Sequence, residues 1–231
     1  MNTQTPDRDG VVYKRHSLLK RNPQHSREWF SRYYEANHGP LAASQAGFRK
    51  FASRYVQNHV ETFPGAPEPA FDGITMTTQV PRDDYTRGFF NDPDYDNVKP
   101  DEMYLFDLTK TVSVLGREEI AIDGAPSSYK ALILGSSRHF DAMTAEFRSH
   151  LSRLTINRME VATASALGFS GAGFQHDVLA EAWFGDDASR REAFKSISGS
   201  ASGPAGATPL FLPVREVLIF GPEKPWPVHG H

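Results

Sequence analysis

The order of β-rich and helix-forming segments repeats once along the chain, and this repeat constrains the fold most. Residues 11–122 read as strand, helix, two strands, helix and strand, and residues 129–221 give the same order with different side chains. Such a βαββαβ unit is the ferredoxin-like motif, whose helices cover one face of an antiparallel sheet. The other face must be covered too, and two units in one chain can cover each other. The sequence therefore predicts an α+β protein in which two ferredoxin-like units in tandem form an α/β barrel with the helices outside.

The expected elements follow from hydrophobic periodicity and from turn residues. Strands are predicted at 11–21, 54–60, 72–80 and 110–116, and again at 129–135, 158–169, 177–184 and 211–221. Helices are predicted at 26–38, 83–92, 138–154 and 187–197, with the unit connection at 123–128 and a mobile Gly/Ser/Ala-rich loop at 196–209. The expected organisation is a disordered tail at 1–10, a first unit at 11–125, a diverged second unit at 126–222 and a C-terminal tail at 223–231.

Composition excludes several classes of protein. A formal charge of −3 and a pI near 6.3 leave no electrostatic footprint for nucleic acid. The chain has no cysteine, which excludes disulfides, thiolate nucleophiles and cysteine-ligated metals. The first ten residues carry no apolar signal segment, and no run of 18 apolar residues occurs. We therefore expect a cytoplasmic protein without a membrane span.

His38 is the first candidate for chemistry. The predicted helix begins at Ser26, a favourable N-cap, and Gly39-Pro40 is expected to end it just after His38. The carbonyl end of a helix stabilises an imidazolium, so His38 is placed to act as an acid or a base near neutral pH. The alternative is a histidine that only caps the backbone carbonyls of the helix. The aromatic Tyr34, one turn earlier, is a candidate substrate contact.

The strand at 54–60 offers a line of polar side chains. A period of two places Tyr55, Gln57 and His59 on one face, opposite Val56 and Val60. If the valines face the helices, the phenol, amide and imidazole line a cavity inside the barrel, with Tyr55 and His59 as catalytic candidates and Gln57 as a substrate contact. The alternative is a solvent-exposed sheet rim.

Four weaker candidates lie on other predicted strands. Thr75 and Thr77 share one face of the third strand and could continue the polar line, although β-propensity alone also explains them. Glu181 stands between two alanines and is a candidate cavity carboxylate. Trp183 could stack on a substrate ring, or serve only as a core aromatic. The histidines form no spacing typical of a metal site, and no Gly-rich phosphate loop or G-x-S-x-G elbow is present.

Together these segments resemble the EthD family of the dimeric α/β-barrel superfamily. The resemblance rests on "LLKRNP", "SREWFSRYY", "NHGPLA", "RYVQNHV", "FDGI" and "DEMYLFDLTKTVSVLGREE", which occur in this order across residues 16–119. In the second half, "DVLAEAWF" is similar to the family's third strand, whereas "GITMTT" departs from it. The second half also lacks an equivalent of His38-Gly39-Pro40-Leu41. This asymmetry favours one functional cavity, built mainly by the first half.

The resemblance implies a barrel with a central apolar cavity, no bound cofactor or metal, and a homodimer. It implies function only in outline, because the superfamily includes decarboxylases, dehydratases, lactone isomerases and cofactor-free oxygenases. We expect a cofactor-independent lyase, a decarboxylase or else a dehydratase, that acts on an apolar aromatic or phenolic small molecule by histidine acid–base catalysis. The alternatives are a monooxygenase or isomerase on the same fold, and a small-molecule-binding protein without catalysis.

Overall fold

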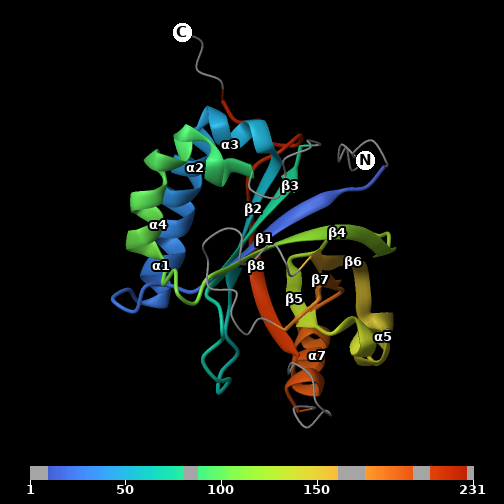
Figure 1. Cartoon of the computed structure of the whole chain (residues 1–231). Coiled ribbons are helices and arrows are strands. Elements are labelled where there is room, and N and C mark those ends of the chain that lie inside the picture. The colour runs from blue at the N-terminus through green and yellow to red at the C-terminus, as the bar shows by residue number, and fades with distance from the viewer. Residues whose placement is uncertain (1–9, 81–87, 161–174, 200–208, 228–231) are drawn as a thin grey trace.

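Antiparallel strands close into a barrel, and the helices lie outside it (Figure 1). The computed structural model of the chain describes residues 10–80, 88–160, 175–199 and 209–227. Its strands are β1 Tyr13–Leu19, β2 Ala52–Val60, β3 Gly73–Gln79, β4 Val112–Ile122, β5 Tyr129–Gly135, β6 Leu151–Glu160, β7 Val178–Phe184 and β8 Leu210–Phe220. The predicted α+β barrel is thus confirmed.

The strand order repeats between the two halves. Within residues 13–122 the neighbours run β4-β1-β3-β2, and within residues 129–220 they run β8-β5-β7-β6. Pairing of β2 with β8 and of β4 with β6 then closes the barrel. The core is therefore completed within one chain, so the fold does not require a second copy. The homodimer and the unit boundaries stay predictions.

The helices gather over the outer face of each half (Figure 1). In the first half these are α1 Arg27–Tyr33, the π-helical turn η1 Tyr34–His38, α2 Gly39–Ser44, α3 Ala46–Phe51, the 3-10 turns η2 Gly88–Asn91 and η3 Pro93–Asn97, and α4 Lys99–Leu105. In the second half they are α5 Ser137–Ala145, the 3-10 turn η4 Arg148–His150 and α7 Asp187–Gly199. None of the described helices is long and apolar enough to cross a membrane.

The first helix does not end at Gly39-Pro40, so that prediction was wrong. The chain stays helical from Arg27 to Ser44, because a π-helical turn lets the Gly39 N–H bond the carbonyl of Tyr34, five residues back. Pro40 then stands in the first turn of α2, where the fixed φ of proline suits the helix. His38 is thus an internal residue of a long helical segment and does not cap its end.

Three other predicted boundaries also differ. Of the helix predicted at 83–92, the described residues form only short 3-10 turns, and the regular helix is α4. The helix predicted at 138–154 ends at Ala145, and Leu151 already begins β6. Residues 196–199 of the predicted loop belong to α7, while 200–208 and the predicted strand residues 161–169 lie outside the described residues.

The two faces of β2 are reversed relative to the prediction. Val56 and Val60 belong to the apolar cluster inside the barrel, whereas Tyr55 packs with α2 and α3 on the outer face. The physical reason is that the barrel interior takes the more apolar side of each strand. On the helix side, by contrast, helix groups can satisfy polar side chains of the sheet. Gln57 and His59 accordingly hydrogen-bond to groups of α1 and η1.

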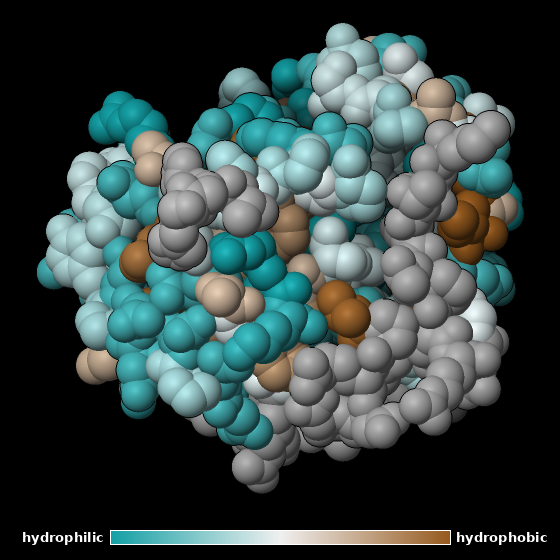
Figure 2. Space-filling view, turned by 90° about the horizontal axis from the view of Figure 1, so that it is seen from above, coloured by the Kyte–Doolittle hydropathy of each residue, from teal (hydrophilic) through white to brown (hydrophobic). Residues whose placement is uncertain are grey.

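The outer surface seen from above is largely hydrophilic, with hydrophobic residues scattered across it (Figure 2). Among the described residues the exposed large hydrophobic side chains are Met103, Tyr104, Ile120 and Tyr129. Apolar burial is therefore concentrated in the barrel interior and in the layer between the sheet and the helices.

His16 makes the stability of the fold depend on pH. Its side chain is wholly buried inside the barrel, and burial lowers its pKa to about 3. The native protein keeps His16 neutral where the unfolded chain, with a pKa near 6.5, takes up a proton. Stability is therefore complete above pH 6.5 and is lost as pH falls toward 3, by about 1.4 kcal/mol per pH unit.

Urea unfolding at pH 7, 6 and 5 measures this slope. In His16→Leu the unfolding free energy should fall less steeply with pH, by about 1.4 kcal/mol per pH unit, because one proton fewer is taken up on unfolding. In the control His150→Leu, at an exposed site, the slope should be unchanged. Equal slopes in all three proteins would show that His16 does not carry the effect.

Candidate active site

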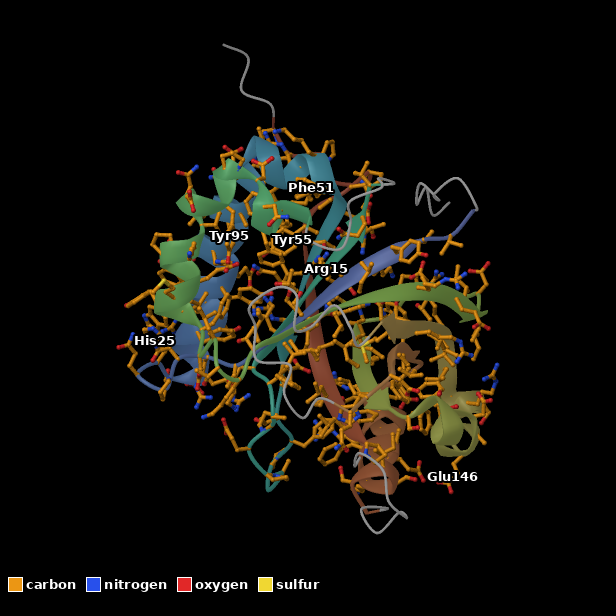
Figure 3. All side chains as sticks on the ribbon, in the orientation of Figure 1. Arg15, His25, Phe51, Tyr55, Tyr95 and Glu146 are labelled. Carbon is orange, nitrogen blue, oxygen red and sulfur yellow. The ribbon has the colours of Figure 1, made fainter. Side chains whose placement is uncertain are left out.

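A small pocket of about 60 Å³ lies between the sheet of the first half and its helices. Its walls are largely aromatic and include Phe48, Phe51, Phe89, Phe90 and Phe106. The polar lining residues include Arg15, His38, Tyr55, Thr75, Thr77 and Glu102. Figure 3 shows Arg15, Phe51 and Tyr55 on the side of the sheet that meets the helices. An apolar pocket with a few convergent polar groups is the usual form of a small-molecule site.

His38 and Asp101 form an acid–base pair at this pocket. The Nδ1 atom of His38 lies 2.7 Å from Oδ2 of Asp101, and the Tyr33 hydroxyl donates to Oδ1 of the same carboxylate at 2.7 Å. Burial tends to raise the pKa of Asp101, but the hydrogen bonds from His38 and Tyr33 outweigh it and hold the pKa below its ordinary value. The carboxylate therefore fixes the proton on Nδ1, which leaves Nε2 of His38 as the atom able to exchange a proton with a ligand.

The π-helical turn that carries His38 is locked to the sheet by Gln57. Its Nε2 donates to the carbonyl oxygen of Tyr34 at 2.7 Å and to the hydroxyl of Tyr55 at 3.0 Å. A Cβ on Gly39 would lie only 2.8 Å from that amide nitrogen, so only glycine permits this approach. Gln57 is wholly buried and does not line the pocket, so it acts on the site by positioning.

The phenols of Tyr34 and Tyr55 are held neutral. Burial raises the pKa of Tyr34 well above its ordinary value, and burial likewise raises the pKa of Tyr55. The Tyr34 hydroxyl is 2.5 Å from Oγ1 of Thr75. Because Tyr55 accepts a hydrogen bond from Gln57, its own O–H can be donated toward the pocket that it lines.

Glu102 brings a second acid–base group to the pocket. The hydroxyl of Tyr95 donates to its Oε2 at 2.6 Å, and burial raises the pKa of Glu102 above its ordinary value. A carboxyl group with a raised pKa exchanges protons closer to neutral pH. Glu102 directly follows Asp101 in α4, so one helical turn supplies both carboxyl groups.

Arg15 places a cation in the pocket wall. Its guanidinium carbon lies 5.7 Å from the centre of the Phe90 ring, and the side chain is buried. Burial lowers the pKa of Arg15 to about 10, which still leaves it protonated at neutral pH. A substrate with an anionic oxygen is therefore electrostatically favoured here.

Five predicted site residues do not line this pocket: Tyr34 and Gln57, which join the π-helical turn to the sheet, and three that lie elsewhere. His59 is bonded through Nδ1 to the Ser31 hydroxyl at 2.8 Å, burial lowers its pKa to about 4, and it is not among the lining residues. Glu181 and Trp183 line a different cavity, at one mouth of the barrel. The expectation that all the candidates share one cavity inside the barrel was therefore wrong, and the first pocket lies on the helix side.

Sequence reasoning missed Asp101, Glu102 and Arg15. The first two had a readable signal, because Pro100 and two acidic residues are typical of a helix start. Arg15 had none, since an arginine in a strand is ordinarily a surface residue. Among the described residues no group of histidine, aspartate and glutamate side chains could hold a metal ion.

Comparison with known proteins agrees with the geometry of the first half. The EthD domain family matches residues 22–109, so this part of the chain is similar to that family. The matched segment contains His38, Tyr55, Asp101 and Glu102. No curated protein matches the chain.

Two solved structures are similar to this chain at a low level. One is a protein from Lactobacillus acidophilus NCFM that is provisionally named a monooxygenase, with 7% identity and a TM-score of 0.44. The other is provisionally named a chlorite dismutase, with 9% identity and a TM-score of 0.42. Each likeness covers 90% of this chain and 95% of the other. At these values neither bears on the activity of this chain.

The contact between Gly39 and Gln57 should be sensitive to a single methyl group. Gly39→Ala places Cβ against the Gln57 amide and, at 3.0 Å, against Cδ1 of Ile219. We expect a loss of about 1–3 kcal/mol in unfolding free energy, which is typical of overpacking. Urea unfolding measures it, with the exposed Asn37→Ala on the same turn as control. A variant as stable as the control would mean that the helix can move away from the sheet freely.

Proposed function

We propose that the chain is a lyase that acts on a small aromatic or phenolic molecule without a cofactor and uses His38 as its general acid–base. The observation that carries this proposal is the His38–Asp101 pair at the wall of an apolar, aromatic pocket. The pair provides one imidazole with a fixed tautomer and an open Nε2. At about 60 Å³ the pocket is smaller than the cavities that hold a single ring, so a single-ring substrate requires its aromatic walls to move apart.

Decarboxylation is the first choice of reaction. The protonated Nε2 of His38 delivers its proton to the ring carbon that bears the carboxylate, which gives a dearomatised cation stabilised by the phenolic oxygen. The bond between that carbon and the carboxylate then breaks, CO2 leaves, the electron pair returns to the ring and restores its aromaticity, and solvent reprotonates the imidazole. Asp101 stabilises the imidazolium form throughout. An aromatic, water-poor pocket favours loss of charge from the carboxylate.

The other polar groups would hold the substrate. Tyr55 donates a hydrogen bond to the keto or phenolic oxygen, while Thr75 and Thr77 border the same wall. Arg15 attracts the anionic substrate into the pocket. Tyr34 and Gln57 act indirectly, since they join the π-helical turn to β2 and β3. This division of roles does not require His59, Glu181 or Trp183.

Dehydration is the second candidate, and Glu102 favours it. Elimination of water needs one group to accept a proton from carbon and another to protonate the leaving hydroxyl. The neutral His38 could be the base, and Glu102, with its raised pKa, could be the acid. Both reactions use the same pocket, and their products distinguish them.

The strand order that the two halves share is also part of this proposal. We infer that the two halves descend from one ferredoxin-like unit, because each shows the same strand order. Only the first half carries the His38 element, so one active site per chain is expected even though the framework is doubled.

The test is kinetic. The protein is incubated with single-ring hydroxybenzoates, and mass spectrometry follows the products while an electrode follows oxygen. From the hydroxybenzoates we expect loss of CO2 without oxygen uptake; dehydration is tested with a cyclic β-hydroxyketone, from which water would be lost. His38→Gln should lower turnover by about 10²–10⁴-fold, as expected for loss of a general acid–base.

His59→Gln is the matched control, because it removes a buried imidazole from the same layer but not from the pocket wall. It should retain turnover. Full turnover in His38→Gln would overturn the assignment of His38. Oxygen uptake would indicate an oxygenase, an isomeric product an isomerase, and unchanged compounds that nevertheless bind a non-catalytic binding protein.

A further inference from the structure

The helix-side pocket is closed around the groups that give it its chemistry. Of its lining residues, His38, Tyr55 and Phe89 are each at most 8% exposed, and the enclosed volume is about 60 Å³. Cavities that hold a single aromatic ring are larger than this. A ring can therefore enter and fit only if part of the wall moves.

The segment 88–98 forms one wall of the pocket and is built separately from the sheet. It contributes Phe89 and Val98 to the lining and consists of the 3-10 turns η2 and η3. The N–H of Asp92 bonds the carbonyl of Phe89, that of Tyr95 bonds Asp92, and that of Val98 bonds Tyr95, each at 2.9 Å. These bonds close the segment on itself, so it can move as a unit without breaking them.

Gly88 provides a hinge at the first residue of this segment. Its φ is +51°, in the left-handed region that side chains other than glycine rarely adopt. A Cβ at this position would come no closer than 3.7 Å to its neighbours, the nearest of which is Arg15. Glycine is therefore required here by backbone conformation and not by lack of space, and its backbone rotates at low cost.

Side chains hold the segment against α3. The N–H of Gly47 donates to Oδ2 of Asp94 at 2.6 Å, and Nζ of Lys50 lies 3.3 Å from Oδ2 of Asp92. A Cβ on Gly47 would lie only 2.2 Å from Oδ1 of Asp92, so glycine permits this close approach. These two contacts, Gly47–Asp94 and Lys50–Asp92, form a clasp between the segment and α3. The three side chains are half-exposed or exposed, so water can replace the contacts when they part.

The inner side of the segment carries groups that belong to the pocket. Arg15 lies over the ring of Phe90, with 5.7 Å between the guanidinium carbon and the ring centre. The hydroxyl of Tyr95 donates to Oε2 of Glu102 at 2.6 Å. Movement of the segment away from α3 therefore withdraws an aromatic wall from the pocket and Tyr95 from Glu102, and its return restores both.

We propose that residues 88–98 form a lid, which opens at the clasp to admit an aromatic ligand and closes over it. Gly88 is the hinge at one end, and the buried Val98, at the start of α4, is the fixed point at the other. Closure excludes water from the ligand and sets Tyr95 against Glu102. Because the pocket is the ligand site only under the proposed function, this proposal rests on that function.

Thiol labelling measures the opening without any ligand, because the chain has no cysteine of its own. Ala42→Cys places one thiol on the pocket wall, and Ala180→Cys places one in the apolar cluster between the second half of the sheet and its helices. With Ellman's reagent we expect Ala42→Cys to react at least about tenfold faster, since Ala180→Cys reacts only when the barrel unfolds. If Ala42→Cys does not fold, Thr77→Cys in the same pocket takes its place. Equal rates at the two sites would overturn the lid.

Loss of the clasp should speed the opening. Asp94→Ala removes the bond from Gly47 and should raise the labelling rate of Ala42→Cys about tenfold. Asp96→Ala is the matched control, because it makes the same change of charge at an exposed position of the same segment, and it should leave the rate unchanged. Equal rates in the two variants would show that the clasp does not hold a lid.

A disulfide across the clasp should lock the lid. A Cβ on Gly47 would lie 2.5 Å from Cγ of Asp92, so Gly47→Cys and Asp92→Cys are close enough to join. In calorimetry the oxidised double variant should not bind 2,4-dihydroxybenzoate, and dithiothreitol should restore binding. Equal binding by both forms would overturn the lid. If the wild type does not bind the benzoate but Ala42→Cys still reacts fast and Asp94→Ala speeds it, the lid is supported and the proposed substrate is wrong.

Discussion

The candidate active site depends on how closely one helical segment approaches the sheet. At Gly39 the backbone comes so near to Gln57 that no side chain fits between them, and the amide of Gln57 bonds the carbonyl of Tyr34 at the start of the π-helical turn. This turn rotates His38 toward the pocket while the helix continues to Ser44. Without this turn, Asp101 would lose its hydrogen bond with the imidazole of His38. The position of the proposed catalytic atom thus rests on a glycine and a buried amide.

The barrel uses each strand for two purposes. Along β1, Lys14 and His16 face the interior, while Arg15 and Ser17 face the helix layer, and β2 and β3 alternate in the same way. Apolar and ion-paired residues fill the interior because it is enclosed on every side by sheet, so an unpaired charge there would be costly. The helix side tolerates isolated polar groups, since helix atoms can bond them. A single fold therefore presents an aromatic acid–base pocket on one side of the sheet and a charged cavity on the other.

The sequence predicted the element order and the barrel because these follow from hydrophobic periodicity, which is local. It also singled out His38, Tyr55 and Thr75, which the structure brings to one pocket. The sequence prediction failed where tertiary contacts determine the local structure. The helix continues past Gly39-Pro40 because of a π-helical turn, and the direction in which each face of β2 points depends on which side of the sheet encloses the barrel interior. Asp101 lies 63 residues from its partner His38, and no local pattern could join the two. Glu181 and Trp183 were expected in a cavity inside the barrel, and they line the cavity at its mouth, apart from the pocket that His38 lines.

The central claim is that Asp101 holds His38 so that its Nε2 exchanges a proton with a ligand in the helix-side pocket. Nitrogen-15 NMR of the histidine rings during titration with 2,4-dihydroxybenzoate tests this most directly. We predict a His38 that carries a proton on Nδ1 in the free protein, a large shift of its Nε2 signal on binding, and unchanged signals from His59. A His38 without a proton on Nδ1 in the free protein, or a bound ligand that shifts His59 and leaves His38 unchanged, would contradict this claim.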